Sequence, residues 1–254
     1  MHTILEVKDL TKQFYKNKQL FTAVDHISFQ LQQGECLGIV GESGCGKSTT
    51  VKMLTHLLKP DSGEILLEGT DIQHLKAKSL KKLYTEIQMV FQTPQDSFDP
   101  RKTLGHGIME SMRNQGISRK EARMRMQKLL EQVELSAEFA DRYPNQVSGG
   151  QCQRAAIARA LAIEPKILVC DEATSALDVT VQAQIVELLK RLQKEMNLSI
   201  LLICHDLALV QHLCDRVLVM YQGKIMEEGN PDKVINFPEN DYTKMLVEAA
   251  MMGQ

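Results

Sequence analysis

Short apolar runs alternate with stretches of helical periodicity along most of the chain. Runs typical of strands occupy residues 4–7, 36–40, 167–170, 200–204 and 217–220. Apolar side chains between Val181 and Met196 recur every three or four positions, which predicts one buried face of an amphipathic helix. A further helical pattern lies between the runs at 200–204 and 217–220. Strand, helix and strand in this order predict βαβ units with parallel strands, and therefore an α/β fold.

The middle of the chain follows a different pattern. Residues 93–143 contain no strand-like run, and charged segments of helical period dominate there. Ser118 and Glu121 have the spacing of a capping box, and an apolar stripe from Ala122 to Val133 follows them. We therefore expect an all-helical subdomain inserted into the α/β core.

Apolar and polar residues alternate in the N-terminal part of the chain in a way that is typical of antiparallel strands. Residues 1–35 and 64–69 show this alternation, with Asp61-Ser62-Gly63 as a turn. Near the C-terminus a hairpin is expected at residues 221–224, followed by an irregular tail.

Composition and charge describe an ordinary globular chain. The 254 residues are 43% hydrophobic, and 30 basic against 32 acidic side chains give a formal net charge of −2. This charge offers no electrostatic reason to expect nucleic acid as a partner. No apolar run approaches the roughly 20 residues that a membrane-spanning helix needs, and the N-terminus lacks a signal-peptide pattern. The six cysteines form no CxxC pair and lie mostly in apolar runs, so we expect buried thiols in a reducing compartment.

A phosphate-binding loop follows the run at residues 36–40. Residues 41–48 read GESGCGKS, which fits GxxxxGK[ST], and a helical pattern comes next. Glycines allow successive amides to point at phosphate oxygens, and the helix adds its positive end. Lys47 can reach the β- and γ-phosphates, and the Ser48 hydroxyl can ligate Mg²⁺. The predicted nucleotide-binding residues here are Gly41, Ser43, Gly44, Cys45, Gly46, Lys47, Ser48 and Thr49.

An acidic pair ends the apolar run at residues 167–170. Asp171, at the tip of a strand beside the phosphate loop, could hold Mg²⁺ through water. Glu172 could orient or deprotonate a water molecule near the γ-phosphate. Taken alone, the same pattern fits a plain strand ending. Together with the phosphate loop it indicates a hydrolytic nucleotide site.

Further segments resemble the ABC-type ATPase family. Residues 147–151, VSGGQ, resemble the family's LSGGQ signature, and residues 171–178 resemble its Walker B strand running into the D-loop at Asp178. Gln92 matches the Q-loop glutamine and His205 the switch histidine. Phe14 sits where the family places an aromatic side chain against adenine, with Tyr15 as the competing position.

The resemblance implies a fold and a set of roles. It implies a P-loop, RecA-like ABC ATPase core with an N-terminal antiparallel β subdomain and an inserted α-helical subdomain. Residues 1–92 and 160–254 would form the core, and residues 93–159 the helical subdomain that carries the signature. The implied cofactors are ATP and Mg²⁺. The implied catalytic residues are Glu172, His205 and Gln92, and the implied Mg²⁺ ligands are Ser48, Gln92 and Asp171.

The same resemblance implies partners. In this family the signature acts on the nucleotide of a second ATPase chain, which would be a related, distinct chain or a second copy. The residues expected to act across that interface are Ser148, Gly149, Gly150 and Gln151. Two membrane permease subunits and, indirectly, an extracytoplasmic substrate-binding protein would complete an importer. The chain would then lie at the cytoplasmic face of the membrane.

Two segments resemble those of peptide- and nickel-importer ATPases. Residues 95–101 are similar to the family's "DP…NPR" segment, and residues 238–244 to its "HPYT" segment, with Asp241 in place of proline. A helix of the membrane subunit would dock along residues 93–101, with Phe98 in the contact. The chain's end at Gln254 favours the nickel or metal-chelate branch over the peptide branch. The alternative is a soluble, non-transport ABC ATPase such as one for iron–sulfur cluster assembly.

Overall fold

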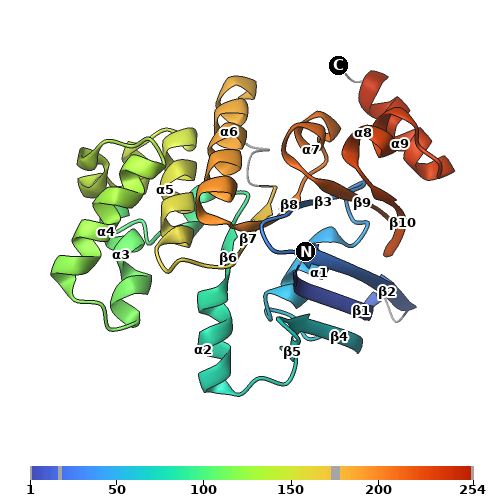
Figure 1. The fold of residues 1–254 in the computed structure, drawn as a ribbon, viewed down its shortest axis with the longest axis horizontal. Helices are drawn as coiled ribbons and strands as arrows, with labels where there is room; N and C mark the ends of the chain where they lie inside the picture. The colour runs from blue at the N-terminus through green and yellow to red at the C-terminus, as the bar shows by residue number, and fades with distance from the viewer. Residues whose placement is uncertain (1, 17–18, 173–177, 253–254) are drawn as a thin grey trace.

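The fold is built on two sheets, seen in a computed structural model that describes residues 2–16, 19–172 and 178–252 (Figure 1). A four-stranded sheet has the order β2-β1-β4-β5, and a six-stranded sheet has the order β10-β9-β3-β8-β7-β6. The strands are β1 (Thr3–Lys16), β2 (Gln19–Gln32), β3 (Cys36–Val40), β4 (Ser62–Leu67), β5 (Thr70–Asp71), β6 (Ile87–Val90), β7 (Ile167–Asp171), β8 (Ser199–Ile203), β9 (Arg216–Tyr221) and β10 (Lys224–Gly229).

Helices cover the six-stranded sheet and extend beyond one of its ends (Figure 1). The helices are α1 (Lys47–Leu54), α2 (Ala77–Glu86), α3 (Leu104–Asn114), α4 (Arg119–Gln132), α5 (Gly149–Leu161), α6 (Val179–Met196), α7 (Leu207–Leu213), α8 (Pro231–Asn236) and α9 (Asp241–Met252), with 3₁₀ turns η1 (Pro94–Ser97), η2 (Ala137–Asp141) and η3 (Pro144–Gln146). Within the described ranges, none of these helices is long and apolar enough to cross a membrane.

The predicted parallel strands are confirmed. β3 pairs in parallel with β8 and with β9, and β7 pairs in parallel with β6 and with β8. Only the edge strand β10 among those described in this sheet runs antiparallel, in the hairpin with β9 that the sequence predicts. The C-terminal ends of the parallel strands therefore meet at one edge of the sheet, where loops can gather functional side chains.

The strands of the large sheet are apolar on both faces because each face is covered. On β3, Leu37 and Ile39 pack into the core shared with α1 and the small sheet. Cys36 and Val40 pack into the opposite core, which α6 and α7 also fill. Burial of an aliphatic side chain of this size contributes about 1.5–3 kcal/mol, so both layers hold the sheet in place. All six cysteines are buried and free, as the sequence predicts.

The small sheet forms from the two long strands of the N-terminal segment and from β4. The turn predicted at residues 61–63 is correct only for Asp61, because Ser62 and Gly63 already belong to β4. Asp61 holds this bend by accepting bonds from Lys12 Nζ at 2.8 Å and the Gln13 amide at 2.7 Å. A Cβ on Gly63, whose φ is +93°, would lie 2.5 Å from the Asp9 carbonyl oxygen. Glycine is therefore required at this close approach of the strands.

The helices α3, α4 and α5 lie together at one end of the molecule (Figure 1). Ser118 caps α4 because its Oγ accepts the Glu121 amide at 3.2 Å. The Glu121 carboxylate pairs with Arg125 at 2.7 Å, the next turn along the same helix. The division of the chain into a core and a helical subdomain at residues 93–159 stays a prediction, and α5 continues to Leu161.

The irregular tail predicted after the hairpin is wrong. The segment forms α8 and α9, which lie beside β10 at the other end of the molecule (Figure 1). Asn230 caps α8 through its bond from the Asp232 amide, and Pro231 occupies the first helical position, where proline is favoured. Tyr242 and Thr243 of α9 are buried although their side chains carry polar groups. A search for apolar periodicity alone therefore does not detect this helix.

Candidate nucleotide site

The loop between β3 and α1 is fixed by two glycines. Gly41 has φ +149° and Gly46 has φ +115°. A Cβ on Gly41 would lie 2.1 Å from the Met220 carbonyl oxygen, and one on Gly46 would lie 2.4 Å from the Ala23 carbonyl oxygen. The loop is therefore wedged between the end of β9 and β2, and only glycine fits at these two positions.

Lys47 begins α1 and is 5% exposed. Its Nζ donates to the Gly41 carbonyl at 2.6 Å and to the Glu42 carbonyl at 2.9 Å, and lies 3.7 Å from Cys45 Sγ. The ammonium is thus held against the loop at the positive end of a helix. Ser43, Gly44 and Ser48 are exposed, Thr49 is half-buried, and Gly41, Cys45 and Gly46 are buried. The loop combines a cation with a helix N-terminus, the arrangement that binds phosphate.

Asp171 ends β7 and brings a carboxylate to the same edge of the sheet. Burial raises the pKa of the Asp171 carboxyl, the charge of Glu172 raises it further, and Lys52 and Lys47 oppose the shift. Its Oδ1 is buried without a hydrogen-bond partner in the part of the chain that the structure describes. A buried, unpaired carboxylate oxygen beside a phosphate loop fits a divalent cation such as Mg²⁺.

Glu172 adopts the left-handed backbone conformation, with φ +48°. This conformation is unfavourable for a residue other than glycine, and such strain is common where a side chain has to be aimed. The Glu172 amide donates to the Ile203 carbonyl at 2.9 Å, which holds the strained peptide against the end of β8.

The remaining predicted residues follow the ends of neighbouring strands. Gln92 comes just after β6 and His205 just after β8, and both are exposed. Because β6, β7, β8 and β3 are parallel, their C-terminal ends put these residues at the same sheet edge as the phosphate loop. Asp178 caps α6, and its Oδ1 accepts the Val181 amide at 3.0 Å. Residues 173–177 of the predicted D-loop segment lie outside the described residues.

The signature residues form the N-terminus of α5. Ser148 Oγ accepts the Gln151 amide at 3.3 Å, and Gln151 Oε1 accepts the Ser148 amide at 2.9 Å, which completes a capping box. Ser148 and Gly149 are exposed, whereas Gly150 is buried. A Cβ on Gly150 would lie 2.5 Å from Val181 Cγ1, so the signature packs directly against the start of α6 that Asp178 caps.

Phe21 is an aromatic residue beside the phosphate loop that the sequence did not predict. It lines a pocket of about 460 Å³ together with Thr22, Glu42, Ser43, Gly44, Cys45, Tyr221 and Gln222. Phe14, the predicted adenine-stacking residue, pairs with Phe21 across β1 and β2 and is 39% exposed. Lys12 Nζ lies 5.5 Å from the Phe14 ring centroid. Sequence reasoning missed Phe21 because only the strand register brings it to the loop.

The role expected for Phe98 in docking a helix of the membrane subunit stays a prediction, but the ring itself is buried. Phe98 is 8% exposed, and a Cβ on Gly107 of α3 would lie 2.6 Å from its Cδ1. The ring is therefore part of the core beneath α3. The exposed residues of the segment at 93–101 are Thr93, Gln95, Asp96, Pro100 and Arg101.

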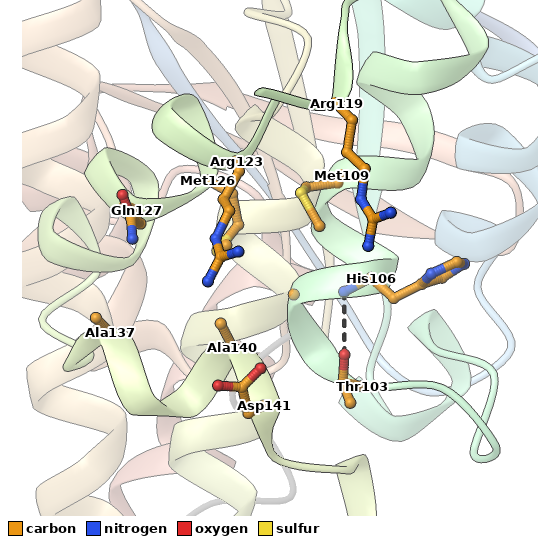
Figure 2. A pocket seen from close by; sticks show the side chains of 11 residues that line it. Thr103, His106, Met109, Arg119, Arg123, Met126, Gln127, Ala137, Ala140 and Asp141 are labelled. Atoms are coloured by element: carbon orange, nitrogen blue, oxygen red, sulfur yellow. Dashed lines mark hydrogen bonds between the residues drawn. The ribbon is translucent and has the colours of Figure 1, made fainter. Parts of the chain in front are cut away.

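A second pocket of about 240 Å³ lies between α3, α4 and η2 (Figure 2). Figure 2 shows Arg119 and Arg123 extending from α4 toward η2 and the start of α3, with Met109 between them. The rim also carries His106 and Asp141. The pocket contains none of the nucleotide-site residues described above, so it is a separate feature of the helical end.

Comparisons with known proteins agree with this geometry. Residues 24–175 match the family model described as "ABC transporter". The oligopeptide transport ATP-binding protein OppF of Salmonella typhimurium is 45% identical over 246 residues, which cover 96% of this chain and 74% of that protein. A putative peptide import ATP-binding protein of Brucella ovis is 42% identical over 247 residues, covering 97% and 78%.

Solved structures show the same fold. CbiO1 from Clostridium perfringens, part of the ABC transporter complex cbiONQ, gives a TM-score of 0.84 at 32% identity, covering 94% of this chain and 93% of that one. The ATP-binding cassette MJ0796, in a dimeric post-hydrolysis state bound to ADP and Pi, gives 0.80 at 30% identity, covering 89% and 98%.

Proposed function

Because the chain belongs to the ABC transporter family of ATP-hydrolysing proteins, we propose that it drives the import of short peptides through a membrane transporter. The observation that carries the proposal is the 45% identity with an oligopeptide transport ATP-binding protein over 96% of this chain. A second relative, at 42% identity, also has peptide import in its name. In this role the chain would attach peripherally to permease subunits at the cytoplasmic face of the membrane.

Nickel or metal-chelate import, which the sequence favoured, has no specific support among these relatives. That interpretation depended on where the chain ends, and chain length says nothing about the chemistry of a cargo. The alternative of a soluble assembly ATPase is not favoured either, because the relatives reported above at 42–45% identity carry transport or import in their names.

The proposed chemistry begins with the phosphate loop. Lys47 and the amides around it would hold the nucleotide phosphates, and the Phe21 side chain would contribute to the pocket beside them. Glu172 would accept a proton from the attacking water, while Gln92 and His205 would contact the reacting phosphate from neighbouring strand ends. Ser48, Gln92 and Asp171 would hold Mg²⁺, which when bound neutralises charge on the phosphates.

The signature would act on the nucleotide of a second ATPase chain. Support comes from the exposure of Ser148 and Gly149 at the N-terminus of a 13-residue helix, an arrangement that can bind an anion from outside the chain. The partner would be a homologous chain or a second copy, so that two nucleotides lie between two chains. Closing and reopening of this pair would drive the transporter.

The pocket at the helical end is the proposed docking site for the membrane subunit. Its lining begins at Thr103, two residues after the segment at residues 93–101, and includes Arg119 and Arg123 together with Met109 and Met126 (Figure 2). A cytoplasmic helix of a permease with an apolar face and an acidic side chain would match it in charge. Two permease subunits, and indirectly an extracytoplasmic substrate-binding protein, would complete the importer.

The proposal is tested by replacing the native protein with Glu172→Gln in cells. Uptake of a radiolabelled tripeptide should fall to background, because the variant binds ATP but scarcely hydrolyses it. Glu248→Gln, an exposed change on α9, is the matched control and should import normally. Cellular nickel measured in the same cultures should stay unchanged. Lost nickel with normal peptide uptake would overturn the peptide assignment, and normal uptake of both would overturn the transport role.

A further inference from the structure

The C-terminal helix α9 reaches the phosphate loop through one tyrosine. Tyr242, in its first turn, is 8% exposed. Its ring stacks on Tyr221 of β9, with a centroid separation of 4.0 Å and an interplanar angle of 27°. Tyr221 in turn lines the pocket beside residues 42–45. The stack thus connects a helix more than 190 residues downstream of the loop to the wall of the nucleotide pocket.

The Tyr242 hydroxyl makes a direct contact with the loop. The Glu42 amide donates to Tyr242 Oη at 3.3 Å. On the other side of the same residue, the Glu42 carbonyl accepts from Lys47 Nζ at 2.9 Å and from the Cys45 amide at 3.3 Å. Glu42 is therefore bonded on one side to α9 and on the other to the lysine that faces phosphate.

The tyrosine itself is held firmly in place. Asn240 Oδ1 accepts the Tyr242 amide at 2.9 Å. The Glu227 carboxylate accepts the Glu239 amide at 3.0 Å and the Asn240 amide at 3.1 Å, which fixes the segment before α9 to β10. Burial raises the pKa of Tyr242, with the Glu42 amide opposing the shift, so the phenol is neutral at physiological pH. A neutral, buried and anchored hydroxyl is a fixed acceptor rather than a mobile one.

The rest of the loop has few other supports from outside its own segment. Gly223 donates its amide to the Cys45 carbonyl at 2.9 Å, and the close packing of Gly41 and Gly46 restricts the two ends of the loop. Glu42 lies between these fixed points and its side chain is exposed. Without Tyr242, the Glu42 peptide could rotate and carry the acceptor of Lys47 with it.

We propose that Tyr242 is a positioning residue of the ATP site: through Glu42 it sets the conformation of the phosphate loop and the place of Lys47, so that the C-terminal helix controls nucleotide affinity. The inference rests on the loop's role in ATP binding and not on the cargo. Its test uses purified protein and nucleotide alone, so its failure is distinguishable from a failure of the peptide-import proposal.

The decisive variant is Tyr242→Phe, which removes the hydroxyl and keeps the ring stack. The dissociation constant for the fluorescent analogue mant-ATP should rise about three- to tenfold, as expected for loss of one hydrogen bond to a neutral group. The midpoint of thermal unfolding should stay within about 2 °C of the wild type, because the stacked ring is retained. KM for ATP should rise in parallel, with a smaller change in kcat.

Two further variants separate positioning from stability. Tyr242→Leu removes stack and hydroxyl, and should lower the unfolding midpoint as well as nucleotide affinity, so phenylalanine rescues stability but not affinity. Thr243→Val changes the neighbouring buried position and should bind mant-ATP like the wild type. Wild-type affinity in Tyr242→Phe would overturn the proposal. An equal loss of affinity in Thr243→Val would also overturn it, since any disturbance of α9 would then suffice.

Discussion

The phosphate loop and the signature both lie at helix N-termini, yet they differ in how far the rest of the chain surrounds them. At the phosphate loop, Lys47 is 5% exposed and is bonded to two carbonyls of its own loop, and other residues of that loop contact β2, β9 and α9. At the signature, Ser148 and Gly149 are exposed, and only Gly150 turns inward against Val181. The first site is supported by distant segments of its own chain, and the second faces outward.

In the proposed two-chain arrangement, each chain would carry two incomplete halves of a site. The half that holds a nucleotide needs a rigid cradle, and its rigidity comes from contacts between distant segments. The signature half, which we propose acts on the nucleotide of another chain, needs only a well-capped helix end, and the capping box of Ser148 and Gln151 supplies it locally. Four substitutions test the comparison, in order of decreasing expected effect.

The largest effect is expected from Glu172→Gln, which removes the proposed base but not the cradle. We expect kcat for ATP hydrolysis to fall about 10²–10⁴-fold. Affinity for mant-ATP should stay within about twofold of the wild type, because the phosphate loop is intact. Phosphate release and fluorescence titration measure the two quantities. If Glu172→Gln kept more than a tenth of the wild-type kcat, another residue would have to act as the base.

Lys47→Met removes the buried cation from the cradle and leaves the signature untouched. We expect kcat/KM to fall about 10²–10³-fold, since a preorganised cation at a phosphate is lost. Here affinity should fall too, in contrast to Glu172→Gln. Lys59→Met, an exposed change beyond α1, is the matched control and should behave like the wild type. If Lys47→Met bound mant-ATP like the wild type, Lys47 would not contribute to nucleotide binding.

Gly150→Ala disturbs the packing of the signature against α6. The new methyl group would lie 2.5 Å from Val181 Cγ1, and overpacking of this kind costs about 1–3 kcal/mol. Thermal unfolding should show a drop of several degrees, and kcat should fall because the signature is displaced. The double variant Gly150→Ala/Val181→Ala should recover most of the stability. If the second change brings no recovery, the close contact is not the cause.

The smallest effect is expected on thermal stability in Asp171→Asn without Mg²⁺, and its size depends on pH. The pKa of Asp171 is raised above its usual 3.8, so the folded protein binds this proton more tightly than the unfolded chain does. The ionised carboxylate therefore costs stability that increases as the pH rises through the folded-state pKa. Without Mg²⁺, Asp171→Asn should melt slightly above the wild type at pH 8, and the two curves should converge toward pH 4. If the unfolding midpoints of the two proteins instead moved apart toward pH 4, the raised pKa of Asp171 would be contradicted.

Much of the core fold follows from local sequence. The runs at residues 36–40, 167–170 and 200–204 are apolar at every position because each strand is covered on both faces, and that pattern predicts buried parallel strands. The phosphate loop is equally local, since its glycines and Lys47 act within one turn. By contrast α9 was missed, because Tyr242 and Thr243 are buried although their side chains carry polar groups.

Contacts between distant segments could not be predicted. The β1–β2 register places Phe21 opposite Phe14 and beside the loop, and register is set by the whole sheet rather than by either strand. The sequence identifies Gly150 as part of the signature motif. That no Cβ fits at this position follows only from its contact with Val181, which lies on another helix. Phe98 lies in a polar segment and is nevertheless buried, because Gly107 of α3 leaves room for its ring. In each case tertiary packing decides the role.

The burial of all six thiols has a practical consequence for watching this molecule work. Reagents that alkylate cysteine in the folded state should find a nearly silent background, since each native sulfur lies in a buried residue. A single cysteine introduced at exposed Asn145, just ahead of the signature, would then accept one fluorophore at a known place. Energy transfer between two such labelled chains would report whether they approach and separate during ATP turnover.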